Sequence, residues 1–315
     1  MENQTILYML VLSGLSDLPS LQLPLFLVFL LVYLMTLTGN LLIVLLIYTD
    51  SHLQTPMYFF LGTLACLDMG YSSVITPRML FDFHTQKMLI SIQACITQIY
   101  FFLFFIISEL VLLSVMSFDR YFAICRPLHY TQIMHWKACV LLILGVLIFS
   151  MLYPLVHVLL LLKLTFCIST PLQSFFCDLP QLLLVSCSDT FINLLLILIT
   201  AIFLGGGIFT LTFCPYIIIL NTIMKMSKAM RSKAFSTCSS HLTVVFTVYG
   251  ISFFSYFHPN AKDHSAVDKV PSVFYTVLTP LVNPLIYSLR NEKIKISLKK
   301  ALCKLNIMRG KYVFE

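Results

Sequence analysis

Residues 116–130, with the sequence MSFDRYFAICRPLHY, decide the fold because a carboxylate, a guanidinium and an aromatic ring meet there after a long apolar run. Residues 88–118 contain a single charge, Glu109, and a short basic stretch follows Arg120. Asp119 and Arg120 therefore lie where a membrane-spanning helix leaves the hydrocarbon. A charge pair at that depth is costly unless it is paired or functional. The stretch predicts a switch facing the cytoplasm.

The composition around this stretch predicts a polytopic membrane protein. The 315 residues are 59% hydrophobic and only 10% charged, and their mean hydropathy is +0.93. A soluble globule of this size needs far more polar surface. The net charge of +7 fits basic loops on the cytoplasmic side better than nucleic-acid binding, which requires a basic domain that is absent here.

Seven uncharged or nearly uncharged windows are long enough to cross about 30 Å of hydrocarbon, which takes roughly 20 helical residues. They predict an all-α bundle of seven transmembrane helices in one domain, at residues 20–49, 51–77, 88–118, 138–162, 190–224, 234–261 and 270–289. Residues 1–19 carry Glu2 and Asp17 but no Lys or Arg, so no cleavable signal peptide is expected.

The distribution of basic residues predicts the orientation. Fifteen of the twenty Lys and Arg residues fall on the side of Arg120, and basic residues gather in cytoplasmic loops. We expect an extracellular N-terminus at residues 1–22, a bundle at 23–289 and a cytoplasmic tail at 290–315. The acceptor tripeptide at Asn3 would then be exposed to glycosylation. Residues 290–304 alternate basic and apolar positions, which predicts an amphipathic helix on the anionic inner leaflet or, alternatively, a disordered basic tail.

Four cysteines fall on the expected outer face, at positions 95, 167, 177 and 187. Two disulfides are plausible on that oxidising side, and spacing alone allows three pairings. The other six cysteines lie in helices or inside, where reduced thiols are expected.

Two acids lie deepest in the membrane, Asp68 and Glu109. Glu109 and Arg120 are eleven residues apart, close to three helical turns, so they share a helix face that Phe102 and Ile106 continue outward. Two carboxylates in a low dielectric either share a proton or hold a cation, with Asn40 and Asn283 as neutral oxygen donors. Two separate, protonated acids remain the alternative.

Several motifs together carry a family resemblance over nearly the whole chain. They are PMYFFL at residues 56–61, MSFDRYFAIC at 116–125, KAFSTCSSHL at 233–242 and NPLIYSLRN at 283–291. The chain resembles the olfactory, or odorant, receptors, a branch of the rhodopsin-like G-protein-coupled receptors. The DRY and NPxxY elements are typical of the wider superfamily, whereas the first and third motifs are typical of this branch.

The resemblance implies roles for individual residues. It implies disulfides Cys95–Cys177 and Cys167–Cys187, and a sodium pocket at Asp68, Glu109, Asn40 and Asn283. At rest Arg120 would pair with Asp119, and on activation helix six would swing out to admit a G protein. The switch and coupling residues would be Asp119, Arg120, Tyr121, Tyr216, His241, Asn283, Pro284 and Tyr287. The odorant pocket would comprise Phe102, Leu103, Ile106, Ile107, Thr200, Leu204, Tyr249, Ser252, Phe253, Tyr256, Val273 and Thr276.

The ligand is expected to be small, neutral and mostly apolar. The outer halves of helices three, five, six and seven carry no charge, so a charged ligand would find no buried counter-ion. The basic loop at residues 226–233 is the expected contact of a stimulatory olfactory G protein that raises cyclic AMP. The serines and threonine after it would be either phosphorylation sites or helix caps.

Other classes fit the sequence less well. A transporter or channel predicts repeated halves or a polar pore lining, and an intramembrane enzyme predicts a catalytic motif such as HExxH; neither pattern is present. No cofactor is expected apart from the sodium ion. Within the receptor class, the alternative is a receptor of this fold that senses a metabolite or steroid outside the olfactory epithelium.

Overall fold

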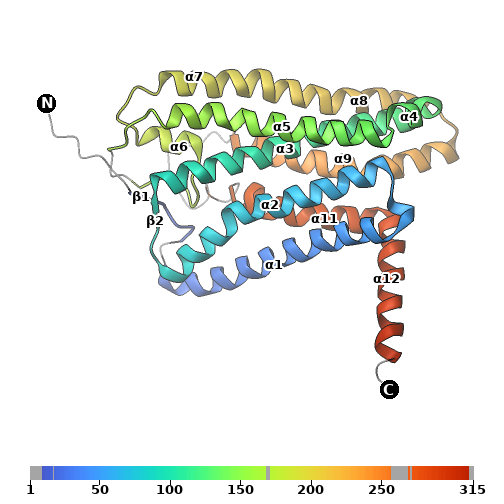
Figure 1. Cartoon of the computed structure of the whole chain (residues 1–315), viewed down its shortest axis with the longest axis horizontal. Helices are drawn as coiled ribbons and strands as arrows, with labels where there is room; N and C mark the ends of the chain where they lie inside the picture. Colours follow the sequence, from blue (N-terminus) through green and yellow to red (C-terminus); the bar gives the residue numbers. More distant parts are fainter. Residues whose placement is uncertain (1–8, 17, 168–170, 257–268, 270–271, 312–315) are drawn as a thin grey trace.

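The computed structural model describes residues 9–16, 18–167, 171–256, 269 and 272–311. Within them, seven long helical segments lie side by side (Figure 1). These segments are α1 (Pro19–Thr49), α2 (Pro56–Thr85), α3 (Ile92–Cys125), α5 (Trp136–Leu161), α7–η2–α8 (Phe191–Thr200, Ala201–Gly205, Gly206–Met224), α9 (Lys228–Tyr256) and η3–α11 (Phe274–Leu278, Thr279–Arg290). They coincide with the seven predicted windows to within a few residues, with two exceptions. Helix α2 continues about two turns past residue 77, and α3 continues about two turns past residue 118.

Five of the described helices are long and apolar enough to cross a membrane, namely α1, α2, α3, α5 and the continuous α7–η2–α8. The sixth segment, α9, is 29 residues long but carries Ser, Thr, His and Tyr side chains along its length. In the seventh segment, α11 has only 12 residues and continues η3. The polarity of these two segments is consistent with a place inside a bundle rather than against lipid.

Proline, serine and glycine fix several helix features. Pro19 and Pro56 occupy the first turns of α1 and α2, where the missing N–H has no cost. The Ser91 hydroxyl caps α3 by accepting from the Ala94 backbone N–H at 3.2 Å. The π-helical turn η2 ends at Gly205, the first of three consecutive glycines, and such turns are uncommon and frequently occur at functional sites.

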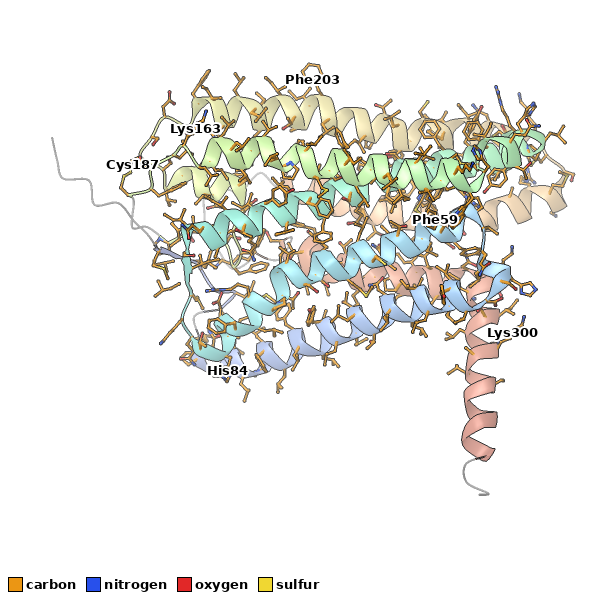
Figure 2. All side chains as sticks on the ribbon, in the orientation of Figure 1. Phe59, His84, Lys163, Cys187, Phe203 and Lys300 are labelled. Carbon is orange, nitrogen blue, oxygen red and sulfur yellow. A yellow bond between two sulfur atoms is a disulfide. The ribbon has the colours of Figure 1, made fainter. Side chains whose placement is uncertain are left out.

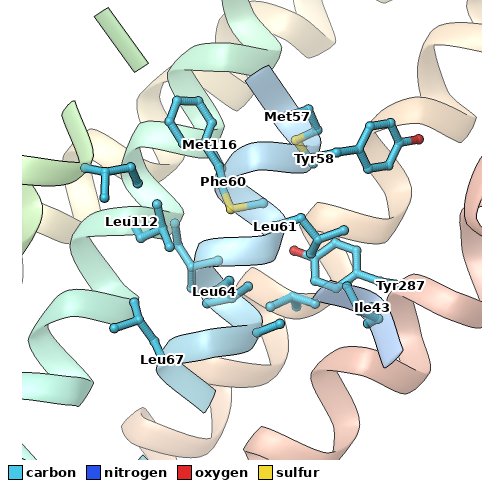
Figure 3. Packing of buried hydrophobic residues seen from close by; sticks show 14 of the residues in the cluster. Ile43, Met57, Tyr58, Phe60, Leu61, Leu64, Leu67, Leu112, Met116 and Tyr287 are labelled. Atoms are coloured by element: carbon cyan, nitrogen blue, oxygen red, sulfur yellow. The ribbon is translucent and has the colours of Figure 1, made fainter. Parts of the chain in front are cut away.

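The main core lies between α2 and α3 and extends to α1 and α11 (Figure 3). Leu112, Leu113 and Met116 of α3 are fully buried there, as is Phe60 of α2. This core fixes the inner half of α3, which carries Asp119 and Arg120. The switch residues therefore stand on a rigid helix rather than on a loop.

At the end of the bundle that carries Cys95, called the Cys95 end below, the chain forms elements that the sequence did not predict. Strand β1 (Met9–Val11) pairs antiparallel with β2 (Leu89–Ser91), and a short helix, α6 (Leu179–Leu184), lies between α5 and α7. The Lys269 ammonium donates to the Gly14 carbonyl at 2.6 Å. Disulfides join Cys95 to Cys177 and Cys167 to Cys187, the same pairs that the family resemblance implies.

At the opposite end, called the Arg120 end, lie η1 (Ser51–Leu53), the short helix α4 (Pro127–Ile133) and α12 (Glu292–Lys311). Helix α12 leaves the bundle at a steep angle to α11 (Figure 1). Figure 2 shows Lys163 and Cys187 at the Cys95 end, and Phe59 and Lys300 at the Arg120 end. The predicted tail helix is thus present, and it continues past residue 304.

Candidate functional site

The centre of the Arg120 end is a cluster of three polar side chains. The Arg120 guanidinium pairs with the Asp119 carboxylate, donating through Nε at 3.0 Å and also through Nη2. The Tyr130 hydroxyl donates to the other Asp119 oxygen at 2.8 Å. Asp119 is fully buried and Arg120 is nearly so. Because a buried charge needs a partner, these contacts hold the guanidinium against its own helix.

A second polar contact at this end joins α8 to α9. The Tyr216 hydroxyl and the His241 Nδ1 atom are hydrogen-bonded, and both side chains are buried. Tyr121 of α3 packs against the apolar cluster that contains Tyr216. Tyr287 of α11 is buried in the main core, and its hydroxyl has no hydrogen-bond partner among the described atoms. Tyr287 faces Leu61 and Ile43 in Figure 3.

Midway along the bundle, one amide group contacts both buried acids. The Asn283 Nδ2 atom donates to both Asp68 oxygens and to Glu109 Oε1, each at 3.1 Å. All three side chains are at most 4% exposed. The two acids therefore converge on α11 from α2 and α3, and they are not separate groups. Pro284 follows inside α11, where it removes a backbone hydrogen bond.

Asn40 belongs to a neighbouring contact. Its Nδ2 atom donates to the Thr36 and Pro280 carbonyls at 3.0 Å each, which ties α1 to α11. Its buried Oδ1 and that of Asn283 lack partners among the described atoms. Two carboxylates and two amide oxygens are hard donors of the kind that alkali and alkaline-earth ions prefer. The donor chemistry therefore fits a sodium ion at Asp68 and Glu109.

Four of the predicted pocket residues lie in one apolar cluster, toward the Cys95 end. Phe102, Leu103 and Ile106 of α3 and Val273 before η3 pack in it together with Phe176. The centroid of the Phe102 ring is 5.4 Å from that of Phe176, and it is 5.8 and 6.1 Å from the ring centroids of Tyr71 and Tyr275. Phe102 is only 4% exposed, so it is a wall of the cluster rather than a mobile surface group.

The remaining described pocket residues, apart from Tyr249 of α9, are spread over three helical segments. The Thr200 hydroxyl accepts from Tyr153 of α5 at 3.3 Å, and Leu204 lies in η2. Thr276 of η3 is buried and donates to its own helix at Ser272. Ile107 is buried in α3. The side chains of Ser252, Phe253 and Tyr256 lie outside the described set, as do all atoms of Asn3.

Tyr249, the predicted pocket residue on α9, packs against the main core and not in the Phe102 cluster, and its hydroxyl belongs to a chain of three that joins α3, α8 and α9. Ser114 of α3 and Thr212 of α8 are 2.7 Å apart, and Thr212 and Tyr249 of α9 are 3.0 Å apart. The Tyr249 ring also packs edge-on against Phe213 with a centroid distance of 5.4 Å. Of these residues the sequence pointed to Tyr249 alone, because hydroxyls from three helices give no common sequence pattern.

Two residues of α4 were not predicted from the sequence. Tyr130 ends the stretch that decides the fold, but nothing in its spacing shows that the chain folds back toward Asp119. Burial and the Asp119 carboxylate both raise the pKa of Tyr130, so it stays a donor. Leu128 is 87% exposed. Its position after Arg126 and Pro127, as an apolar residue in a basic loop, was the sequence signal that could have identified Leu128 as a contact residue.

The fold is that of a rhodopsin-like seven-helix receptor. The structure of squid rhodopsin superimposes with a TM-score of 0.73 at 17% identity, over 94% of this chain and 91% of that chain.

The sequence places the chain more narrowly. A family model described as "Olfactory receptor" matches residues 29–305. Human olfactory receptor 5B12 is 46% identical over 96% of this chain and 97% of its own. Mouse olfactory receptor 8B8 is 45% identical over 93% and 94%, and human olfactory receptor 8G1 is 47% identical over 96% and 97%. The chain belongs to the olfactory receptor family.

Family membership settles the general function. The protein is a multi-pass receptor of the plasma membrane that responds to an odorant and couples to a G protein, and it is not an enzyme. The sequence motifs predict this class, and the prediction is confirmed.

Proposed function

We propose that this receptor binds a small, neutral and mostly apolar volatile beside Phe102, Ile106 and Val273, and that it activates a stimulatory olfactory G protein to raise cyclic AMP. The observation that carries the proposal is the chemistry of this cluster, whose described members are aromatic and aliphatic. The Arg78 and Asp82 charges on α2 neutralise each other in an ion pair at 2.8 Å, and the buried Asp68 and Glu109 side chains both accept hydrogen bonds from Asn283. A charged ligand would therefore enter without a free counter-ion.

In this proposal the Cys95 end is extracellular and the Arg120 end is cytoplasmic. The disulfides at one end favour an oxidising compartment there, and the basic residues of α12 and the α8–α9 loop favour the cytoplasm at the other. The Asn3 acceptor would then be available for glycosylation. Tryptic cleavage at Lys299 and Lys300 in sealed, right-side-out vesicles would contradict this orientation.

Activation would release two contacts at the cytoplasmic end. Ligand binding toward the Cys95 end would shift α9, whose Tyr249 packs against the main core and is hydrogen-bonded to Thr212 of α8. Movement of α9 away from α8 then separates His241 from Tyr216, and Arg120 leaves Asp119. Such an outward helix movement is a known type of switching transition. The space that opens would receive a G-protein segment against Arg120, with Leu128 of α4 as an apolar contact and Lys228 and Arg231 as basic ones.

The Asp68–Asn283–Glu109 cluster would hold the resting state when it binds a sodium ion. The ion would supply positive charge between two carboxylates that repel each other in a low dielectric. In the absence of an ion, Asn283 donates to both acids and keeps α2, α3 and α11 together. Glu109→Gln should abolish the effect of replacing sodium by choline on basal cyclic AMP, whereas an unchanged sodium effect would contradict this site.

The ligand proposal is tested with matched volatiles in cells that carry a cyclic AMP reporter. A panel contains, for each carbon skeleton, a ketone or ester, the corresponding amine and the corresponding carboxylic acid. We expect neutral members to activate the receptor and their charged counterparts to be inactive. Arg120→Ala should abolish the response while surface expression is retained. Activation by the amines or acids alone would refute a neutral pocket.

A further inference from the structure

A cavity of about 320 Å³ lies outside the odorant region, where α1, α11 and α12 meet at the Arg120 end. Its walls include Leu42 and Leu46 of α1, Leu285 of α11, and Ile294 and Leu298 of α12. The volume is within the range of about 300–1,000 Å³ that is typical of small-molecule sites. None of the predicted switch or pocket residues except Pro284 lines it.

Two polar contacts keep α12 in place and so keep the cavity open. The Asn291 Oδ1 atom caps α12 by accepting from Lys293 N and Ile294 N at 3.1 and 3.3 Å, and Tyr58 of α2 donates to the same oxygen at 3.0 Å. Ser297 is buried and hydrogen-bonds Asp50, beside η1. Hydrogen bonds from the His52 backbone, from Ser297 and from the His52 ring lower the pKa of Asp50 to about 2. This carboxylate stays ionised at physiological pH.

The lining is effectively apolar, although it includes two hydroxyls. Thr38 donates to the Leu34 carbonyl at 2.7 Å, and Ser288 donates to the Leu285 carbonyl at 3.2 Å. Both hydroxyls therefore bond to their own helices. A buried water needs two to four polar partners, so hydrocarbon fills this space better than water.

Basic residues flank the cavity on α12. Lys295 and Lys299 follow Ile294 and Leu298 by one position, a rotation of about 100° on a helix with 3.6 residues per turn. Ser297 faces Asp50 on the opposite flank, together with Lys293. Lys299 is exposed, and Lys295 forms an ion pair with the exposed Glu292 at 2.9 Å. A basic row beside an apolar cavity complements an anionic headgroup joined to an acyl chain.

We propose that this cavity is a binding site for one anionic phospholipid of the inner leaflet, with an acyl chain between α1, α11 and α12 and the headgroup at Lys295 and Lys299. The proposal rests on the cytoplasmic orientation of the Arg120 end given above, but not on the odorant. The basic side chains of Lys295 and Lys299 favour an anionic lipid over a helix of a second receptor copy as the occupant.

Gly39 offers a way to fill the cavity without disturbing the fold. It lines the space, and a Cβ atom there would approach Pro284 no closer than 3.6 Å, an ordinary contact. Gly39→Leu therefore places a side chain in the cavity. Gly145 of α5 is exposed, and a Cβ atom at that position would have no neighbouring atom within 4 Å, so Gly145→Leu is the matched control.

The test is native mass spectrometry of the purified receptor with phosphatidylserine or phosphatidylcholine added at equal concentration. We expect wild type and Gly145→Leu to retain one phosphatidylserine in preference to phosphatidylcholine, and Gly39→Leu to lose that adduct. Lys295→Gln and Lys299→Gln should each lower the affinity for phosphatidylserine about fivefold, which corresponds to about 1 kcal/mol per basic residue near the surface. Lys293→Gln, on the other flank, should have a smaller effect.

Two outcomes would overturn the proposal. One is equal retention of phosphatidylserine by Gly39→Leu and Gly145→Leu. The other is a loss of receptor dimers in Gly39→Leu with unchanged lipid adducts, which would make the cavity part of an interface between copies. Neither readout needs an odorant or a G protein. A receptor that binds the lipid but ignores every neutral volatile would refute the proposed ligand class alone.

Discussion

Tyr130 lies in a short helix outside the bundle, yet its hydroxyl reaches the carboxylate that holds Arg120. Such a hydrogen bond to a charged group stabilises the state in which it forms by about 1.5–3 kcal/mol. If this state is the resting one, Tyr130→Phe should raise basal cyclic AMP about tenfold or more, normalised to surface expression. Tyr48→Phe is the control, because Tyr48 is 82% exposed. Unchanged basal signalling in Tyr130→Phe would remove this residue from the switch.

At the same scale, the sequence singled out the Asp119–Arg120 pair, whose contact the structure contains, and missed Tyr130. A charge pair at a membrane exit is informative by itself, because its cost demands a partner or a role. Tyr130 is informative only once α4 folds back beneath α3. Glu109 and Asn283 differ in the same way, because one could be placed from the sequence and the other only from the packing of the helices. Helical spacing placed Glu109 in line with Arg120, whereas the bridge through Asn283 depends on how α11 packs.

Among the elements, the loop before α6 carries an acid whose titration can be measured. Asp178 precedes α6, and burial raises its pKa from 3.8 to about 6, with partial compensation by a backbone hydrogen bond from Leu179. The folded loop therefore binds more protons than the unfolded loop between about pH 4 and pH 6, so the free energy of unfolding should fall as pH rises through this window. Above about pH 6 the carboxyl is ionised in both states, so the free energy of unfolding no longer changes through this group.

Asp178→Asn should remove that pH dependence. Thermal unfolding of the purified receptor, followed from about pH 4 to pH 7, should show a declining midpoint for the wild type and a flatter profile for the variant. The variant should be more stable near pH 7 and similar near pH 4, because only the ionised carboxylate is penalised by burial. Parallel profiles for the two proteins would show that this carboxyl is solvated in the folded loop.

Long elements were predictable and short ones were not. Seven apolar windows gave the seven long segments because hydrocarbon thickness fixes a minimum length. Strands β1 and β2 have three residues each and α6 has six. Elements this short are stabilised by partners distant in sequence rather than by their own composition. The predicted start of the tail helix lies within two residues of the observed one, whereas its described part continues past the predicted end at residue 304.

For the whole molecule, the two disulfides should differ in their importance. Cys95–Cys177 closes 82 residues and Cys167–Cys187 closes 20. In the chain-entropy treatment of loop closure these correspond to about 4.5 and about 3.3 kcal/mol of stabilisation. Replacing Cys95 and Cys177 together by Ser should therefore reduce surface expression and thermal stability more than replacing Cys167 and Cys187. Equal losses, measured by flow cytometry and thermal unfolding, would show that local packing outweighs loop closure.

The pairing of β1 with β2 has a practical consequence for anyone who labels this receptor. Residues 9–11 supply one of the two strands, Leu10 and Leu12 are almost fully buried, and Ser13 donates to the Leu172 carbonyl at 2.9 Å. An epitope tag or reporter fused upstream of residue 9 leaves these bonds intact. A fusion that replaces residues 9–13 deletes part of the folded receptor, and poor delivery to the cell surface would then be an artefact of cloning.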